Sequence, residues 1–89
     1  MNQSFLLQII SRDGILFEGK SVFVELDTKE GRVGIYKGHV PQFYFVTKGT
    51  VLFFTENQEK RRIKVEKGFA RVQFEQVMIL VSEAVFLQN

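Results

Sequence analysis

The chain has 89 residues, of which 45% are hydrophobic, with ten Phe, no Cys and a formal net charge of +2. This length predicts a single small domain over residues 1–89, and the lack of Cys excludes disulfides and thiolate metal sites. Acids and bases nearly balance, which argues against the strong positive field of a dedicated nucleic-acid binder.

Short apolar segments separated by turn residues follow one another along the chain. In chain order, we predict strands at residues 5–10, 15–17, 20–27, 32–35, 42–46, 50–55, 61–65, 69–74 and 77–81. Strands are expected to be interrupted at three dipeptides, because Gly accepts backbone angles that other residues avoid. These dipeptides are Asp13-Gly14, Glu18-Gly19 and Lys48-Gly49. Turns about every eight to twelve residues are typical of an all-β sandwich or barrel. No amphipathic helix is predicted, and residues 83–87 have room for one helical turn at most.

The segment 20–27 has the clearest two-residue alternation. Val22, Val24 and Leu26 are predicted to share one face of this strand. Its other face would carry Ser21, Phe23, Glu25 and Asp27. The pattern indicates a half-buried strand in which Phe23 is the one apolar residue on the polar side.

Several Phe residues exceed what a thin sandwich can hide. Phe23, Phe43, Phe45 and Phe54 are predicted to leave an exposed apolar patch. Such a patch would mark an interface with another protein, although core packing is the ordinary place for any single Phe.

The loop from Gly34 to Pro41 contains the only His and the only Pro of the chain. Gly38 is expected to adopt a positive φ, and Pro41 fixes its own φ near about −65°. Val40 precedes this proline and is therefore expected to be extended. The loop should hold one shape with His39 at its tip, and shaped loops on rigid scaffolds often carry function.

The residue types needed for catalysis or metal binding are missing. A lone His39 without a Gly-x-Ser-x-Gly elbow does not support a hydrolase, and it cannot supply the three or four ligands of a zinc site. Glu25 and Asp27 are interpreted as a solvated strand face, and Gly31-Arg-Val-Gly34 lacks the Gly-Lys-Ser/Thr ending of a phosphate-binding loop. No catalytic residue, cofactor or metal is expected.

Nucleic-acid binding remains the alternative function. The basic run Lys60-Arg61-Arg62-Ile63-Lys64, beside aromatic residues, is compatible with an OB-like β-barrel that binds single strands. Glu56, Glu59 and Glu66 flank this run and dilute its field.

A family resemblance favours a different function. Gly31-Arg-Val-Gly-Ile-Tyr-Lys-Gly-His-Val-Pro41 resembles the Gly-x-x-Gly-Ile-x-x-Gly-His-Ala-Pro loop in the N-terminal domain of the ε subunit of F-type ATP synthase. Residues 16–19, 48–51, 67–72 and 77–81 are similar to further steps of that domain, in the same order. The resemblance implies a flattened β-sandwich or barrel of about ten short strands.

The resemblance also implies a mechanical role. In this family the domain belongs to the central stalk and links the γ subunit to the c-ring during rotary, proton-driven ATP synthesis, without catalysing a reaction. The implied contact loop comprises Arg32, Gly34, Tyr36, Gly38, His39 and Pro41. The implied location is peripheral, on the cytoplasmic face of a bacterial plasma membrane. No direct membrane insertion is expected, because no apolar run reaches the roughly 18–20 residues that span a bilayer.

Two departures from the family pattern lead to further expectations. Arg32 stands where the family often has an acidic residue, so we expect an acidic or neutral residue opposite it on the c-ring loop. Residues after the sandwich do not resemble the two C-terminal helices of many family members. We therefore expect neither inhibition by those helices nor an ATP site.

Overall fold

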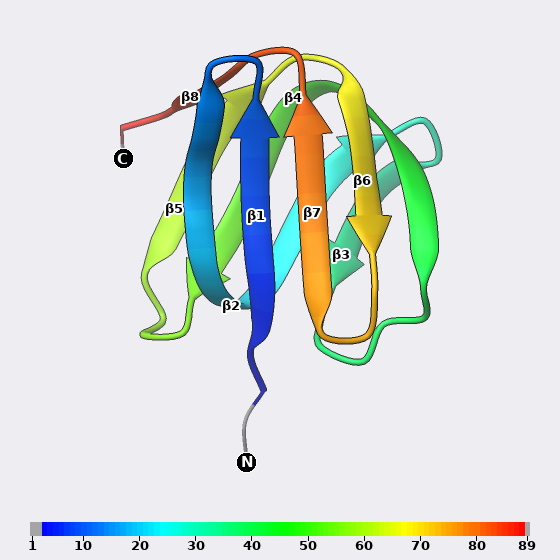
Figure 1. Ribbon diagram of the computed structural model, residues 1–89, viewed down its shortest axis with the longest axis vertical. Coiled ribbons are helices and arrows are strands. Elements are labelled where there is room, and N and C mark those ends of the chain that lie inside the picture. Colours follow the sequence, from blue (N-terminus) through cyan, green and yellow to red (C-terminus); the bar gives the residue numbers. More distant parts are fainter. Residues whose placement is uncertain (1–2, 89) are drawn as a thin grey trace.

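The computed structural model describes residues 3–88, which form eight strands and confirm the predicted all-β class (Figure 1). The strands are β1 (Phe5–Ser11), β2 (Gly14–Thr28), β3 (Gly31–Ile35), β4 (Gln42–Thr55), β5 (Lys60–Val65), β6 (Gly68–Val72), β7 (Gln76–Val81) and β8 (Ala84–Phe86). Their hydrogen-bonded order is β3-β2-β1-β7-β6-β4-β5-β8, and a further pairing between β2 and β4 closes the structure.

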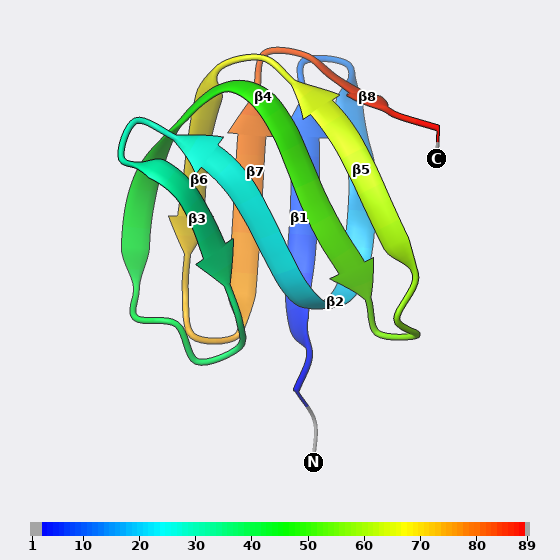
Figure 2. The same ribbon diagram turned by 180° about the vertical axis from the view of Figure 1, so that it is seen from behind.

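Two long strands, β2 and β4, each belong to both layers of the sandwich. We define sheet I as the first half of β2, then β1, β7, β6 and the first half of β4. Sheet II consists of β3, the second halves of β2 and β4, β5 and β8. Figure 1 shows sheet I in front, and Figure 2 shows sheet II in front. Because two strands serve both sheets, the eight strands provide the ten short segments that the resemblance implied.

Two predicted strand interruptions, at Gly19 and Gly49, and the predicted helical turn near the C-terminus differ from the structure. Gly19 pairs with Leu7 and Gly49 pairs with Val65, so the strands continue through both positions. Glycine at position 49 makes room for a neighbour, because a Cβ here would overlap the Asp27 carboxylate. Residues 84–86 form a strand against β5 and not a helical turn, because the backbone of β5 offers free hydrogen-bonding groups at that edge.

The hydrophobic core lies between the two sheets. Its largest fully buried side chains are Phe53, Leu7, Ile9, Leu26, Ile35, Ile63 and Ile79. The ring of Phe17 packs on that of Phe53, with centroids 4.5 Å apart. Within the described residues, no helix has the length and apolar character needed to cross a membrane.

A bulge changes the predicted faces at the start of the segment 20–27. The register shifts between Ser21 and Phe23, so Ser21 is fully buried and Val22 is only half-buried. The Ser21 hydroxyl lies 2.7 Å from the Phe54 carbonyl oxygen and 3.0 Å from that of Phe23. The predicted alternation holds from Val24 onward, and the bulge marks the place where β2 passes from sheet I to sheet II.

Candidate contact surfaces

The loop after β3 and the turn between β6 and β7 lie side by side at one end of the sandwich (Figure 1). The Gly38 N–H donates to the Phe74 carbonyl oxygen at 3.1 Å, which fixes the loop to the turn. Gly38 has a φ of +86°, as the sequence predicted, and this conformation favours glycine. The loop therefore has one defined shape.

His39 does not form the tip of this loop, contrary to the prediction. Its side chain is half-buried, its Nδ1 lies 2.8 Å from the Val40 carbonyl oxygen, and its ring packs against that of Tyr44 in a T-shaped arrangement. The backbone N–H of His39 also donates to the Tyr36 carbonyl oxygen. Because a carbonyl only accepts, Nδ1 carries the proton in this contact. His39 shapes the loop, and two large apolar residues of the loop, Val40 (67%) and Tyr36 (65%), are well exposed.

Two exposed residues of this end were not anticipated from the sequence. Phe74 was predicted to end a strand, where alternation after Ala70 and Val72 would turn it inward. In the structure β6 ends at Val72, and Phe74 lies in the following turn with 61% of its surface exposed. Val40 was considered only for its backbone. The sequence signal that could have indicated an exposed Phe74 was its position as a large apolar residue between the polar residues Gln73 and Glu75.

Arg32 lies at the far end of β3 from the loop, about four residues or roughly 13 Å away along the strand. Its guanidinium is 3.0 Å from the Asp27 carboxylate and 3.6 Å from that of Glu25, and it donates to the Thr50 carbonyl oxygen at 2.6 Å. One cation and two carboxylates leave this cluster with a formal charge of −1. The cluster is therefore not a net positive surface, which removes the physical reason for an acidic partner residue opposite Arg32.

Gly34 and Tyr36, also predicted contact residues, lie beside Phe23 on the outer face of sheet II. The rings of Tyr36 and Phe23 are 4.7 Å apart, and Phe54 follows at 6.4 Å. A Cβ at Gly34 would stand 3.0 Å from the Phe23 ring, so glycine makes room for this ring. With Gln58, these aromatic residues line a shallow hollow.

The four Phe residues predicted to be exposed lie outside the buried core but on two different faces. Phe23 and Phe54 are half-buried on sheet II, whereas Phe43 and Phe45 are exposed on sheet I. The Phe43 ring contacts both Phe45, at 5.4 Å, and Phe69, at 5.2 Å. The predicted single patch is thus two aromatic clusters on opposite sides of the sandwich.

A continuous apolar row crosses the outer face of sheet I. The strand registers place its members side by side in the order Ile15, Ile10, Leu80, Phe69 and Phe45. Its two ends are well exposed, with Ile15 at 60% and Phe45 at 57%, and the middle members are half-buried. We call these five residues the apolar row. Exposed apolar residues that gather on one face are a common feature of interaction surfaces.

The basic run of β5 is divided between two faces. Strand alternation places Lys60, Arg62 and Lys64 on the outer face of sheet II, whereas Arg61 lies on the side of Ile63 and pairs with Glu59 at 3.0 Å. Three of the four basic residues therefore share one face, and Arg61 is separated from them and paired with an acid. This arrangement does not support the nucleic-acid alternative better than the family resemblance.

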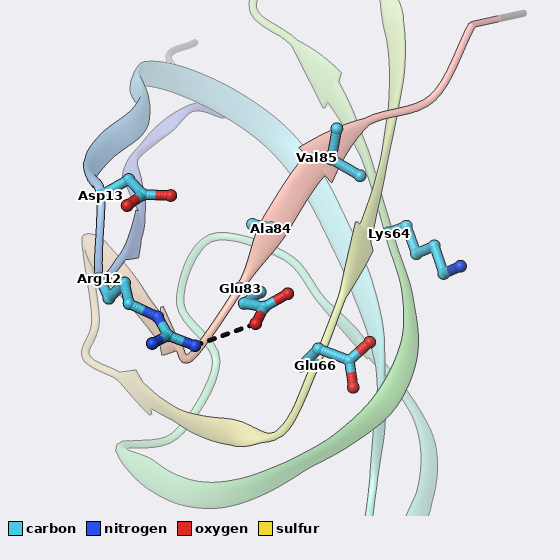
Figure 3. Close-up of a pocket in the computed structure, with 7 residues that line it drawn as sticks. All are labelled: Arg12, Asp13, Lys64, Glu66, Glu83, Ala84 and Val85. Atoms are coloured by element: carbon cyan, nitrogen blue, oxygen red, sulfur yellow. Dashed lines mark hydrogen bonds and ion pairs between the residues drawn. The ribbon is translucent and has the colours of Figure 1, made fainter.

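At the opposite end of the molecule, a polar hollow of about 550 Å³ lies between the β1–β2 turn and β8 (Figure 3). Arg12 and Glu83 form an ion pair of 2.9 Å across it, while the Lys64 side chain points away from that pair. Residues 3–88 contain no cluster of three or more His, Cys, Asp or Glu side chains able to hold a metal ion. We assign no chemistry to this hollow.

The closed sandwich of eight strands places the chain in the class of small all-β domains. Over residues 4–87 the chain matches the family described as "ATP synthase, Delta/Epsilon chain, beta-sandwich domain", and it belongs to that family.

Individual relatives agree with this assignment. The chain is 32% identical over 84 residues to the ATP synthase epsilon chain of Dichelobacter nodosus, covering 94% of this chain and 59% of that protein. It is also 32% identical over 78 residues to that of Shouchella clausii, covering 88% and 58%. The chain thus spans less than two thirds of the length of these relatives.

Solved structures show the same fold. A chain of the Euglena gracilis mitochondrial ATP synthase, in an assembly of OSCP, F1 and c-ring, superposes with a TM-score of 0.89 at 23% identity. This match covers 97% of the present chain and 55% of the Euglena chain. A chain of the Tetrahymena thermophila central stalk and c-ring superposes with a TM-score of 0.74 at 14% identity.

Proposed function

We propose that this domain is part of the central stalk of an F1Fo ATP synthase, where it links the γ subunit to the c-ring during rotary, proton-driven ATP synthesis. Membership of the Delta/Epsilon β-sandwich family is the observation that carries this proposal. Two similar structures support it, because one belongs to an assembly with a c-ring and the other to a central stalk with its c-ring. The domain itself is non-catalytic and works as a rigid connector at the cytoplasmic face of a bacterial membrane.

The apolar row and the loop after β3 suggest which surface binds which partner. The apolar row would pack against γ, because burying apolar area is the main driving force of a stable protein interface. The loop containing Tyr36, Gly38, His39 and Pro41 would meet the polar loops of the c-ring. Gly34 would border that contact from β3, whereas Arg32 lies at the far end of that strand.

The closed hydrogen-bonded architecture suits a part that transmits torque. Strands β2 and β4 run through both sheets and pair with each other, so neither sheet can slide freely over the other. The core between them is packed with fully buried aliphatic and aromatic side chains. A load applied at the loop end would thus reach the apolar row through a stiff body.

The face assignment can be tested with two exposed ends of the apolar row and a control on the other sheet. Ile15→Ser with Phe45→Ser should weaken binding of the purified chain to the cognate γ subunit at least about tenfold, since the two truncations remove two exposed apolar side chains from the proposed interface. Val85→Ser is the matched control, because Val85 is similarly exposed, at 56%, on sheet II. Titration calorimetry would provide the affinities, and thermal melts would report folding.

Three outcomes separate the possibilities. Loss of γ binding in the double variant alone supports the assignment to sheet I. Equal loss in Val85→Ser would contradict that assignment. If the unmodified chain captured neither γ nor c-ring, and instead bound an oligonucleotide in a salt-sensitive manner, the stalk function would be wrong and the nucleic-acid alternative favoured.

A further inference from the structure

The double-loop end, residues 36–41 and 73–75, has an exposed apolar surface that the fold does not use. Phe74 and Val40 are 61% and 67% exposed. The Phe74 ring forms no aromatic pair with another described residue, and neither side chain belongs to the buried core. The exposed surface of Phe74 adds little to the free energy of unfolding, because an apolar side chain stabilises the fold only through the area that is removed from water.

Phe74 is nevertheless held in place. Its backbone carbonyl accepts the Gly38 N–H, and its turn is closed by a hydrogen bond from the Gln73 N–H to the Gln76 carbonyl oxygen at 2.7 Å. The ring lies next to Gly38, where even a Cβ would stand at an ordinary contact distance of 3.7 Å. A large apolar ring on an ordered turn can bind a partner without a large ordering cost.

The other end of the sandwich has a different character. There Arg12 and Glu83 form an ion pair beside Asp13 and Glu66 around the polar hollow (Figure 3). That end also exposes apolar residues, Ile15 at 60% and Val85 at 56%, but Val85 lies among the charged side chains of the hollow. The exposed apolar surface of Phe74 and Val40 is continuous with the loop proposed to meet the c-ring.

We propose that Phe74 is an anchor residue through which the domain binds the c-ring, with its ring inserted in an apolar depression between the loops of adjacent c subunits. Val40 extends the same contact. This inference rests on the proposed function. It requires that the c-ring loops carry aliphatic or small residues opposite Phe74, in addition to the polar groups that would meet the backbone of residues 36–41.

The test compares Phe74→Asn with Phe74→Leu in the full chain. Three quantities are measured for each variant: affinity for the detergent-solubilised cognate c-ring, affinity for γ, and the melting temperature. Phe74→Asn should weaken c-ring binding about tenfold or more, as expected for a central aromatic contact. Phe74→Leu should retain most of the affinity because it keeps an apolar group. Affinity for γ should stay within about twofold for both variants, because the apolar row is intact.

Other results would overturn the proposal. If Phe74→Asn left c-ring affinity within about twofold while Val40→Asn reduced it, Phe74 would not be the anchor, although the stalk function would stand. A parallel fall in γ binding, c-ring binding and melting temperature would make Phe74 a folding residue. Phe74-dependent binding to anionic vesicles or self-association, without an effect on the c-ring, would assign the surface to another occupant. Failure of the unmodified chain to bind γ and c-ring would remove the proposed function and this inference together.

Discussion

The ion-pair cluster around Arg32 predicts a measurable coupling with Asp27. Arg32→Gln removes two ion pairs and a charge-assisted hydrogen bond to the Thr50 carbonyl oxygen. Side chains in the cluster are roughly one-third exposed, with 34% for Arg32 and 37% for Asp27. Partly solvated pairs contribute about 0.5 kcal/mol each and the hydrogen bond about 0.5–1 kcal/mol. The free energy of unfolding should therefore fall by about 1.5 kcal/mol.

A double-mutant cycle isolates the pair. Asp27→Asn is the suitable partner substitution, because its amide oxygen can still accept the Thr50 N–H that Asp27 Oδ2 accepts at 3.2 Å. We expect a coupling energy of about 0.5–1 kcal/mol between positions 27 and 32. The assay is urea unfolding followed by circular dichroism, since the chain has no Trp to report by fluorescence.

Salt provides the internal control. Between about 0.1 M and 1 M NaCl the Debye length falls from about 10 Å to about 3 Å, so the coupling should decrease. A coupling below about 0.3 kcal/mol at low salt would refute the reasoning. Arg32 would then be independent of Asp27, and its charge would be available to an external partner, as the sequence first suggested.

Three further substitutions test the fold and its pH response. Ser21→Ala should lower the free energy of unfolding by about 2 kcal/mol in urea titrations, because the half-buried Phe54 carbonyl loses the buried Ser21 hydroxyl as its partner; a change below about 0.5 kcal/mol would contradict this. Gly68→Ala should cost about 3 kcal/mol in the same assay, since its Cβ would overlap the Leu80 carbonyl oxygen, and wild-type stability would disprove that contact. Burial, followed by the charge of Glu30, raises the pKa of Tyr44 above its ordinary value of 10.0. The unfolded chain therefore releases this proton first, so the contribution of Tyr44 is full below about pH 10 and declines as pH rises further. In alkaline urea titrations the stability of wild type relative to Tyr44→Phe should fall above that pH, and a constant difference would refute the assignment.

Local chemistry made much of this protein predictable from its sequence. Two-residue alternation identified the inward positions Val24 and Leu26, because a strand must bury one face. The positive φ of Gly38 followed from the need for glycine in a tight loop. The family resemblance depended on the same loop residues, which are local in sequence and so are visible without a structure.

Long-range pairing decided the rest. Whether Gly49 breaks or continues a strand depends on its register with Val65 and on its closeness to Asp27, which lie far away in the sequence. Likewise, the exposure of Phe74 depends on where β6 ends and on which loop lies beside the following turn.

Which exposed residues lie on the same face could also be learned only from the tertiary structure. Arg32 is a lone basic residue in the sequence, but folding places it between two carboxylates. Five separate segments of sequence contribute one residue each to the apolar row, and only strand order places them side by side. The sequence determined which residues prefer burial or turns, because those preferences are local. The tertiary structure determined which exposed residues share a face, because that depends on how distant strands pair.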